Sequence, residues 1–130
     1  TLTFKEGRVV DCHAEVGQEV MNRFLEIDKG ARYLGEVALV DESSPIAKSK
    51  RVFGSILYDE NASCHLALGA GYPSTLKGSE ALTNEELLNR AGCNTSAVHT
   101  DFMVGSADLT ITAETPTGEV AIMEGGLFVI

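Results

Sequence analysis

Apolar residues along this chain occur in short runs separated by glycine and polar residues, a pattern that predicts several strands. Near the beginning, Thr1–Phe4 and Arg8–Ala14 have the composition of strands and flank a Glu-Gly turn, so we expect a β-hairpin there. The other runs that we expect to form strands are Tyr33–Val40, Cys64–Leu68, Ala97–Val104, Leu109–Ala113, Val120–Met123 and Leu127–Ile130.

Two stretches have helical signals. Within Gly17–Asp28, apolar side chains gather on one side of a helix. A second helix is expected to begin near Thr83, because Glu86, three residues later, completes the form of a capping box. Val52–Leu57 fits either a strand or a helical turn. Since these elements lack a regular βαβ rhythm, we expect an α+β domain over residues 1–130, with a mixed, mostly antiparallel sheet and two or more packed helices.

The charge balance narrows the classes of partner. Of 130 residues, 10 are basic and 19 are acidic, which gives a net charge of −9. An acidic surface repels phosphate backbones and anionic lipid, so we expect no nucleic-acid partner and no membrane role. No apolar run approaches the roughly 20 residues that span a bilayer. Such acidity either serves solubility or gathers carboxylates around cations, and the composition leaves both open.

The chain has three widely spaced cysteines, Cys12, Cys64 and Cys93, without a C-x-x-C pair. An odd number with this spacing argues against a disulfide framework and a structural zinc knuckle, and it favours a reducing, cytoplasmic compartment. The first residue is Thr1 rather than Met, and the chain opens directly into a strand-like run. We therefore expect either a piece of a longer polypeptide or a processed form.

A histidine and an aspartate stand two residues apart inside the apolar run Ala97–Val104. On a strand, His99 and Asp101 share one face, with their Cα atoms about 7 Å apart, and their side chains could hold one cation or one metal each. The alternative is a hydrogen bond that orients the imidazole ring. The H-x-D spacing alone does not decide between the two.

Acidic and polar residues crowd the segment Asp59–His65, beside an apolar run. We expect His65 to begin a strand, and Glu60 to lie on the preceding turn, from which it can swing toward the same site. Turn chemistry also accounts for the Asp, Asn and Ser residues of this segment. A nucleophilic Cys64 with His65 as its base is disfavoured, because adjacent strand residues face opposite ways, and we expect Cys64 to be a small buried residue.

A third candidate, Glu36, is a carboxylate in a strand-like run whose same-face neighbours are apolar. Burying an ionised carboxylate without a partner is costly, so we expect Glu36 to be paired, exposed or bound to metal. In all, three carboxylates and two imidazoles lie on separate elements: Glu36, Glu60, His65, His99 and Asp101. This donor set suits zinc, cobalt or manganese. Five ligands fit a centre of two divalent metal ions about 3.5–4 Å apart, which activates water against a peptide carbonyl.

Several segments resemble those of the thermophilic-type metallo-aminopeptidases, the aminopeptidase T and aminopeptidase S family. The matching blocks follow in order over nearly the whole chain: Gly35–Val40, Ser44–Ile46, Asp59–Gly69, Gly71–Pro73, Asn94–Ser96 and His99–Gly105. The blocks D-E-N-A-x-C-H and H-x-D-F-M are highly specific together. The resemblance implies a two-metal exopeptidase that acts on peptides with a free N-terminus, and it puts the five ligands named above at the metal-centre positions.

The resemblance also implies an active-site role for Tyr72, whose phenol could stabilise an oxyanion or hold a ligand in place; without the resemblance, loop packing is the commoner role. Members of this family are much longer, typically dimeric, and have a further glutamate upstream at the metal centre. We therefore expect residues 1–130 to be the C-terminal metal-ligand domain of a homodimeric enzyme, without its N-terminal domain. Either Glu60 or the upstream glutamate is the expected general base. The alternative is a non-catalytic dimerisation or metal-binding module that is inactive without the upstream domain.

Overall fold

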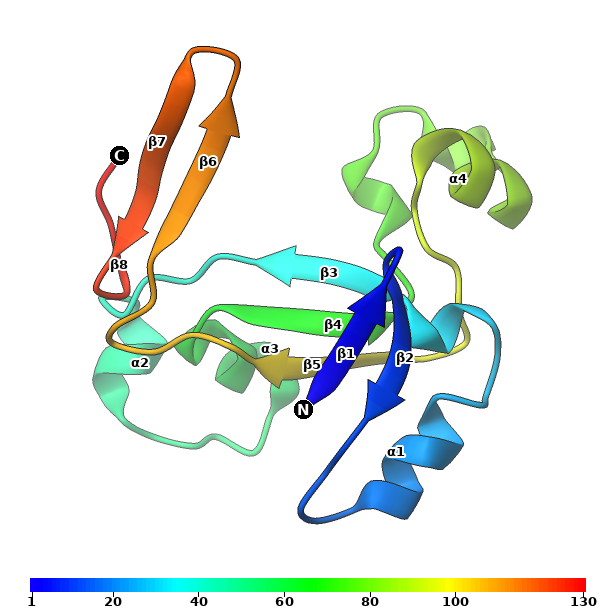
Figure 1. Cartoon of the computed structure of the whole chain (residues 1–130), viewed down its shortest axis with the longest axis horizontal. Helices are drawn as coiled ribbons and strands as arrows, with labels where there is room; N and C mark the ends of the chain where they lie inside the picture. Colours follow the sequence, from blue (N-terminus) through cyan, green and yellow to red (C-terminus); the bar gives the residue numbers. More distant parts are fainter. The chain divides into compact units, whose positions relative to one another are not determined.

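The computed structural model describes residues 1–130 and divides into two compact units. Unit 1 comprises Thr1–Val37 and Leu66–Asp101, and unit 2 comprises Ala38–His65 and Phe102–Ile130. The chain passes between the units three times, and each passage falls within a strand. These strands are β3 (Leu34–Ala38), β4 (His65–Gly69) and β5 (His99–Met103), which form a sheet in the order β3-β4-β5 (Figure 1).

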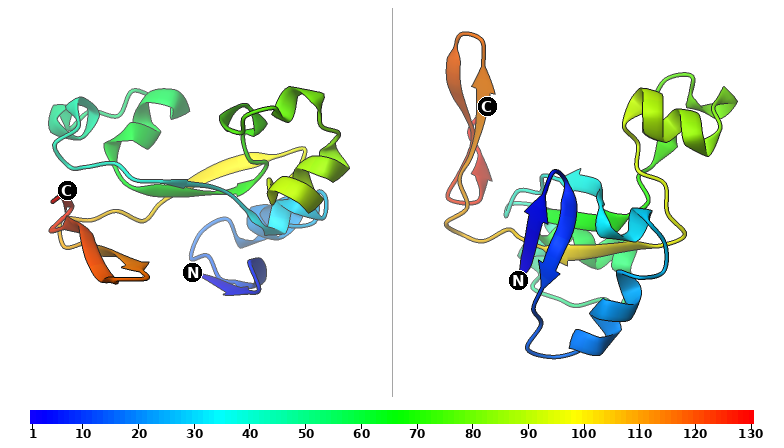
Figure 2. Two further views of the ribbon diagram at one scale, coloured as in Figure 1. Left: turned by 90° about the horizontal axis from the view of Figure 1, so that it is seen from above. Right: turned by 45° about the vertical axis from the view of Figure 1, so that its right-hand side comes forward.

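Unit 1 begins with the predicted hairpin, which is confirmed. Strands β1 (Leu2–Lys5) and β2 (Arg8–Cys12) pair antiparallel, and Figure 2 shows them side by side. The turn between them places Glu6 at φ 50° and Gly7 at φ 76°. Two successive positive φ values are the requirement of a two-residue hairpin turn whose twist matches that of the strands.

The first helix, α1, covers Gln18–Phe24 and is shorter than the predicted stretch Gly17–Asp28. Beyond Phe24 the backbone tightens, because the N–H groups of Glu26 and Ile27 donate to carbonyls three residues earlier. The Asp28 carboxylate then accepts from the N–H of Ala31 and starts a 3₁₀ turn, η1 (Gly30–Arg32). Apolar spacing therefore located the helix correctly, whereas its end depends on a side-chain hydrogen bond.

The predicted strands Tyr33–Val40, Cys64–Leu68 and Ala97–Val104 are confirmed as β3, β4 and β5, with ends that differ by one to two residues. The middle strand, β4, is the most buried of the three, as expected for a strand with neighbours on both edges. Its residues Ala67 and Leu68 are fully buried and belong to the core of unit 1, together with Val9, Leu25, Ala31 and Leu87.

After β4, unit 1 continues through the 3₁₀ turns η3 (Pro73–Thr75) and η4 (Ser79–Ala81) into helix α4 (Asn84–Ala91). The predicted capping box is confirmed: the Thr83 hydroxyl accepts from the N–H of Glu86, and the Glu86 carboxylate accepts from the N–H of Thr83. Leu87 of this helix is buried, whereas Leu88 is 47% exposed.

Unit 2 contains two short helices, α2 (Pro45–Ser49) and α3 (Ile56–Asp59), and the 3₁₀ turn η2 (Glu60–Ala62). Strands β6 (Ile111–Thr115), β7 (Gly118–Glu124) and β8 (Leu127–Phe128) form an antiparallel sheet, in which β6 and β7 make a long two-stranded ribbon (Figure 2). The helical alternative for Val52–Leu57 is correct from residue 56 onward. Helix α2 was missed, although a Ser-Pro pair is a common helix start.

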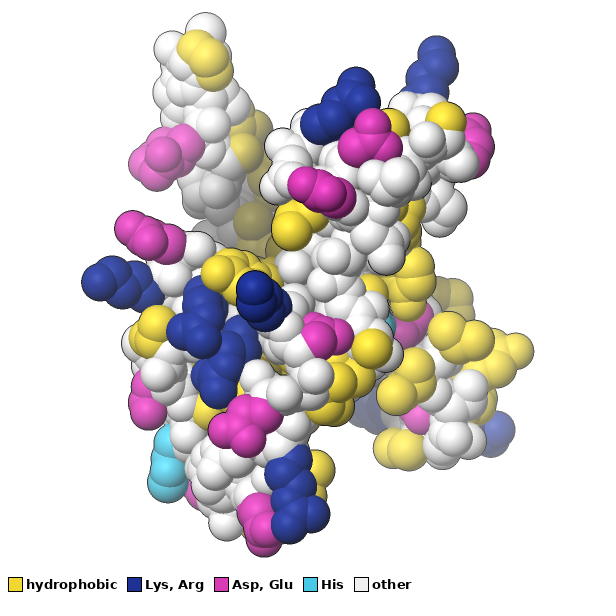
Figure 3. Space-filling view, turned by 90° about the vertical axis from the view of Figure 1, so that its right-hand side faces the viewer, with side chains coloured by type: hydrophobic (Ala, Val, Ile, Leu, Met, Phe, Trp, Pro, Cys, Tyr) yellow, Lys and Arg dark blue, Asp and Glu magenta, His cyan; other side chains and the backbone are white.

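Antiparallel strands and short helices together confirm the α+β class. None of the helices has the length and apolar character needed to cross a bilayer. Acidic and basic side chains are intermixed over the face shown in Figure 3. Because the acidic surplus does not gather into one patch on that face, the surface charge there does not mark a cation site.

Candidate metal centre

Three of the predicted ligands come together in unit 1. Strand β3 supplies Glu36, and β5 supplies His99 and Asp101 on one face. The Nε2 atom of His99 lies 3.4 Å from a carboxylate oxygen of Glu36 and 3.3 Å from Oδ1 of Asp101. One ligand atom from each residue lies within 4.8 Å of the other two. The expected sharing of a face by His99 and Asp101 is therefore realised, and Glu36 joins them from the other edge of the sheet.

The orientation of the His99 ring is set by a backbone carbonyl. Its Nδ1 atom lies 2.7 Å from the carbonyl oxygen of Ala70, which accepts hydrogen bonds only. Nδ1 therefore carries the proton, and in the neutral ring Nε2 presents a lone pair. Histidines that bind metal almost always donate their other N–H to a carbonyl or carboxylate in this way.

The Oδ1 atom of Asp101 is buried and has no hydrogen-bond partner. Its 3.3 Å contact with Nε2 of His99 is not a hydrogen bond in the neutral form of the ring, because the proton of that ring lies on Nδ1. A buried acceptor without a donor is costly. A metal ion bound here would satisfy this oxygen, and a set of one imidazole and two carboxylates fits a divalent metal.

Tyr72 lies beside this group, on the loop that follows β4. Its ring centroid is 4.9 Å from that of His99, and the two planes are tilted by 55°. The tyrosine is 52% exposed, so it is not a core residue. The two expectations for Tyr72, an active-site role and loop packing, both stay predictions.

Unit 2 contains the other two predicted ligands, Glu60 and His65. A carboxylate oxygen of Glu60, on η2, lies within 4.8 Å of a ring nitrogen of His65, the first residue of β4. The Nδ1 atom of His65 is 3.0 Å from the carbonyl oxygen of Ser63, and the residue is buried. Its ring is therefore oriented, like that of His99, by a contact between Nδ1 and a backbone carbonyl. The two-metal centre that unites all five ligands stays a prediction.

Cys64 is a structural residue. It is buried, its thiol lies 3.3 Å from the carbonyl oxygen of Val40, and its sulfur lies 3.8 Å from that of Met123. These contacts agree with the expectation of a small buried residue rather than a nucleophile. All three cysteines are free thiols.

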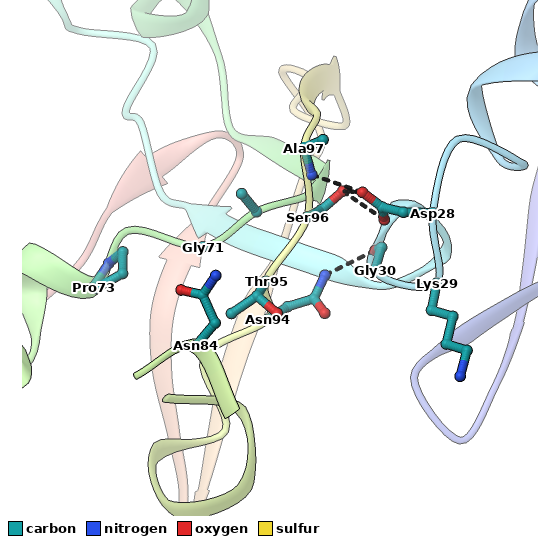
Figure 4. Close-up of a pocket in the computed structure, with 11 residues that line it drawn as sticks. Asp28, Lys29, Gly30, Gly71, Pro73, Asn84, Asn94, Thr95, Ser96 and Ala97 are labelled. Carbon is teal, nitrogen blue, oxygen red and sulfur yellow. Dashed lines mark hydrogen bonds between the residues drawn. The ribbon is translucent and has the colours of Figure 1, made fainter. Parts of the chain in front are cut away.

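A hollow of about 720 Å³ in unit 1 contains none of the predicted ligands. Figure 4 shows two polar side chains of this hollow directed at neighbouring segments: the Asp28 carboxylate faces Ser96 and Ala97, and the Asn94 amide faces Gly30. Hydrogen bonds from the N–H of Ala97, the hydroxyl of Ser96 and the N–H of Ala31 hold the pKa of Asp28 below its ordinary value. The hydrogen bonds of Asp28 therefore hold the segment that leads into β5, the strand that carries His99.

Sequence reasoning missed the parts of the site that are backbone. The Ala70 carbonyl has no signature in the residue type, and its neighbour Asn94 was noticed only within a matching block. The Gly-Ala-Gly-Tyr-Pro composition of residues 69–73 is typical of a loop, and this is the one sequence signal that a backbone group there is available for binding.

Comparisons with known proteins agree with this geometry. Residues 1–128 match the Peptidase M29 model, whose family is described as thermophilic metalloproteases. The chain is 53% identical over 119 residues to aminopeptidase 2 of Geobacillus stearothermophilus, a match that covers 92% of this chain and 29% of that protein. It is 44% identical over 108 residues to aminopeptidase T of Thermus thermophilus, with coverage of 83% and 26%.

Among solved structures, wild-type AmpT from Thermus thermophilus matches with a TM-score of 0.85 at 41% identity. That match covers 99% of this chain and 31% of the other. The chain therefore spans less than a third of the length of the relatives that it matches.

Proposed function

Because the chain belongs to the thermophilic metalloprotease (M29) family, we propose that it carries most of the metal centre of a metal-dependent aminopeptidase. Membership confirms the resemblance that the sequence motifs indicated. The observation that carries the proposal is the convergence of Glu36, His99 and Asp101, whose ligand atoms lie within 4.8 Å of one another. The buried Asp101 oxygen has no hydrogen-bond donor, and a bound cation would satisfy it.

We propose further that the complete centre takes two divalent ions, with zinc, cobalt or manganese as candidates. Its proposed ligands are the five residues that the sequence indicated, Glu36, Glu60, His65, His99 and Asp101. Imidazole and carboxylate ligands together suit these borderline metals. When bound, such ions supply an activated water and polarise the scissile carbonyl of a peptide.

The carboxylates, Glu60 and Tyr72 would each have a separate role in the reaction. The carboxylates make the site electronegative, which favours the protonated N-terminus of a peptide substrate. Glu60 would accept a proton from the attacking water, and an upstream glutamate is the other candidate for this role. Tyr72, next to His99, would donate its phenolic proton to the oxygen that becomes negative.

As the sequence motifs indicate, we propose that the chain is the C-terminal portion of a longer enzyme; it spans 29% of aminopeptidase 2 and 31% of AmpT. A non-catalytic metal-binding or dimerisation module, inactive without upstream residues, is the second candidate for the isolated chain, because the match covers only 31% of AmpT. Exposed apolar residues at the C-terminal end, such as Phe128 and Ile130, support a homodimer. Free cysteines support a cytoplasmic location.

The test compares this chain with a version extended upstream. Metal content is measured by elemental analysis, and hydrolysis is measured with an aminoacyl chromogenic substrate and its N-acetylated counterpart. We expect metal in both forms, and cleavage of the free-amine substrate by the extended form. His99→Ala should lose metal, whereas His13→Ala, outside both ligand groups, should retain it.

The outcomes separate the two candidates. Metal in both forms without cleavage in either supports the non-catalytic module. Cleavage of the acetylated substrate as fast as the free-amine substrate would contradict an aminopeptidase. If neither form binds metal and neither cleaves a substrate, the proposal that the protein is an enzyme is wrong.

A further inference from the structure

Asn94 bonds to the loop after β4 through both its side chain and its backbone. Its amide nitrogen donates to the carbonyl of Gly69 over 2.6 Å and to the carbonyl of Gly30 over 2.8 Å. Its own backbone carbonyl accepts from the N–H of Gly71 over 2.8 Å. Asn94 therefore forms hydrogen bonds with the residues on both sides of Ala70, and it connects this segment to the η1 turn.

Ala70 is confined on its remaining sides by backbone. Its N–H donates to the carbonyl of Val98 over 2.7 Å. A Cβ atom on Gly35 would overlap the Ala70 carbonyl oxygen, and one on Gly69 would overlap the Val98 carbonyl. The loop thus passes closely between β3 and the segment leading into β5. In this frame, Asn94 supplies the side-chain hydrogen bonds that fix the direction of the Ala70 carbonyl.

That direction decides which nitrogen of His99 carries the proton. With the Ala70 carbonyl 2.7 Å from Nδ1, the proton lies on Nδ1 and Nε2 faces Glu36 and Asp101 as a lone pair. Without a fixed acceptor, the neutral ring is free to place its proton on Nε2, between the two carboxylates. In that tautomer Nε2 would donate to a carboxylate and would not bind metal.

We propose that Asn94 is a positioning residue for the metal centre: through the Ala70 carbonyl, it selects the His99 tautomer that leaves Nε2 as a ligand. The inference rests on the proposed function only where it makes His99 a metal ligand. The tautomer itself is a property of the metal-free protein and is measured separately.

The experiment records ¹⁵N NMR spectra of the histidine rings in the metal-free protein, at a pH at which the rings are neutral, and measures zinc affinity by calorimetry. The variants are Asn94→Ala, Asn94→Ser, which retains a hydrogen-bond donor, and Asn84→Ala. Asn84 is the matched control, because it lines the same hollow and makes no hydrogen bond to the loop.

We expect His99 in the wild-type protein to be protonated on Nδ1. Asn94→Ala should give a mixture of tautomers at His99 and weaken zinc binding about 10- to 100-fold, as the loss of groups behind a metal ligand commonly does. The ring of His65, which is oriented by a different carbonyl, should be unchanged. Asn84→Ala should change neither the His99 tautomer nor the zinc affinity. Asn94→Ser should give values between those of the wild type and Asn94→Ala.

Three results would overturn the proposal. One is a wild-type His99 that carries its proton on Nε2, which requires no variant to observe. Another is a folded Asn94→Ala protein with unchanged tautomer and zinc affinity; if that variant does not fold, the same result in Asn94→Ser counts equally. The third is an equal effect of Asn84→Ala. A tautomer that depends on Asn94 in a protein that binds no zinc would contradict the proposed function, but would support the positioning role.

Discussion

The Nε2 atom of His99 and the Oδ1 atom of Asp101 lie 3.3 Å apart, and in the neutral ring both are acceptors. The aspartate side chain is only 6% exposed, so water does not readily take the place of the missing donor. Such a pair is costly in the protein without a cation and favourable with one. The arrangement therefore lowers the stability of the metal-free protein and would raise its affinity for the proposed metal.

This relationship predicts opposite effects of Asp101→Asn on folding and on metal binding. The amide can donate to Nε2 of His99, so the metal-free variant should gain about 1 kcal/mol in free energy of unfolding, since a buried acceptor acquires its partner. Zinc should no longer raise its melting temperature, because binding to the native state alone is what produces that rise. Thermal scans with and without zinc measure both effects.

Glu114→Gln, a charge-neutralising change on β6, is the matched control for Asp101→Asn and should leave the zinc-induced shift intact. A metal-free Asp101→Asn protein that is less stable than the wild type would contradict the assignment of Asp101 as an acceptor without a donor.

Tyr72→Phe should separate binding from chemistry in the extended enzyme. The ring remains next to His99, but the phenolic donor is lost, so kcat should fall about 100-fold or more while KM and metal content change little. Steady-state kinetics with an aminoacyl chromogenic substrate provide the measurement. Tyr58→Phe, in unit 2 beside Phe53, is the control. An unchanged kcat in Tyr72→Phe would restrict Tyr72 to packing.

Asp28 should make the protein less stable in acid. Its pKa is held below the ordinary value of 3.8, chiefly by the N–H of Ala97, so the unfolded chain takes up the proton first as pH falls. The stabilisation is therefore complete above pH 3.8 and is lost as pH falls through the lower, folded-state pKa. Asp28→Asn should be less stable than the wild type at neutral pH.

The same variant should lose part of the acid dependence, because it lacks the titrating group. Denaturant midpoints between pH 6 and pH 2 give the comparison, and Asp11→Asn, on the exposed side of β2, should follow the wild-type curve. An Asp28→Asn curve parallel to that of the wild type would contradict this role.

Gly35→Ala tests the close approach of β3 to the loop that carries Ala70. The added methyl would overlap the Ala70 carbonyl, so we expect a loss of about 1–3 kcal/mol in the free energy of unfolding and weaker zinc binding. Gly54→Ala is the control, because that glycine has open space but a φ of 70°, and it should cost stability without changing zinc affinity. Equal zinc affinities in all three proteins would contradict the model of a confined carbonyl.

Most elements of the fold were predictable because their signals are local. The hairpin, the strands β3 to β8 and the capping box at Thr83 follow from apolar runs, turn residues and a side-chain spacing of three. The errors are local as well. Helix α1 stops at Phe24 because Asp28 bonds to the next turn, and residue types alone do not reveal such a competition.

The candidate ligands were predictable for a different reason: carboxylates and imidazoles in apolar strands are costly unless they are used. Glu36 stood out on that ground, whereas His99 and Asp101 stood out because alternate residues of a strand share one face. Their convergence depends on the order β3-β4-β5, which brings residues 36 and 99 to within a metal's reach across the middle strand. Strand order is a long-range property, and no periodicity in the chain encodes it.

By itself, the sequence determined the α+β class, the family and the residue types that could bind a metal, because each of these is expressed in side-chain pattern and motif. The tertiary structure decided which acceptors face one another, which nitrogen of His99 holds its proton, and which asparagine supports it. These properties depend on backbone carbonyls, and a carbonyl is the same in every residue. The carbonyls of Ala70 and Asn94 differ from the others only in where the fold places them.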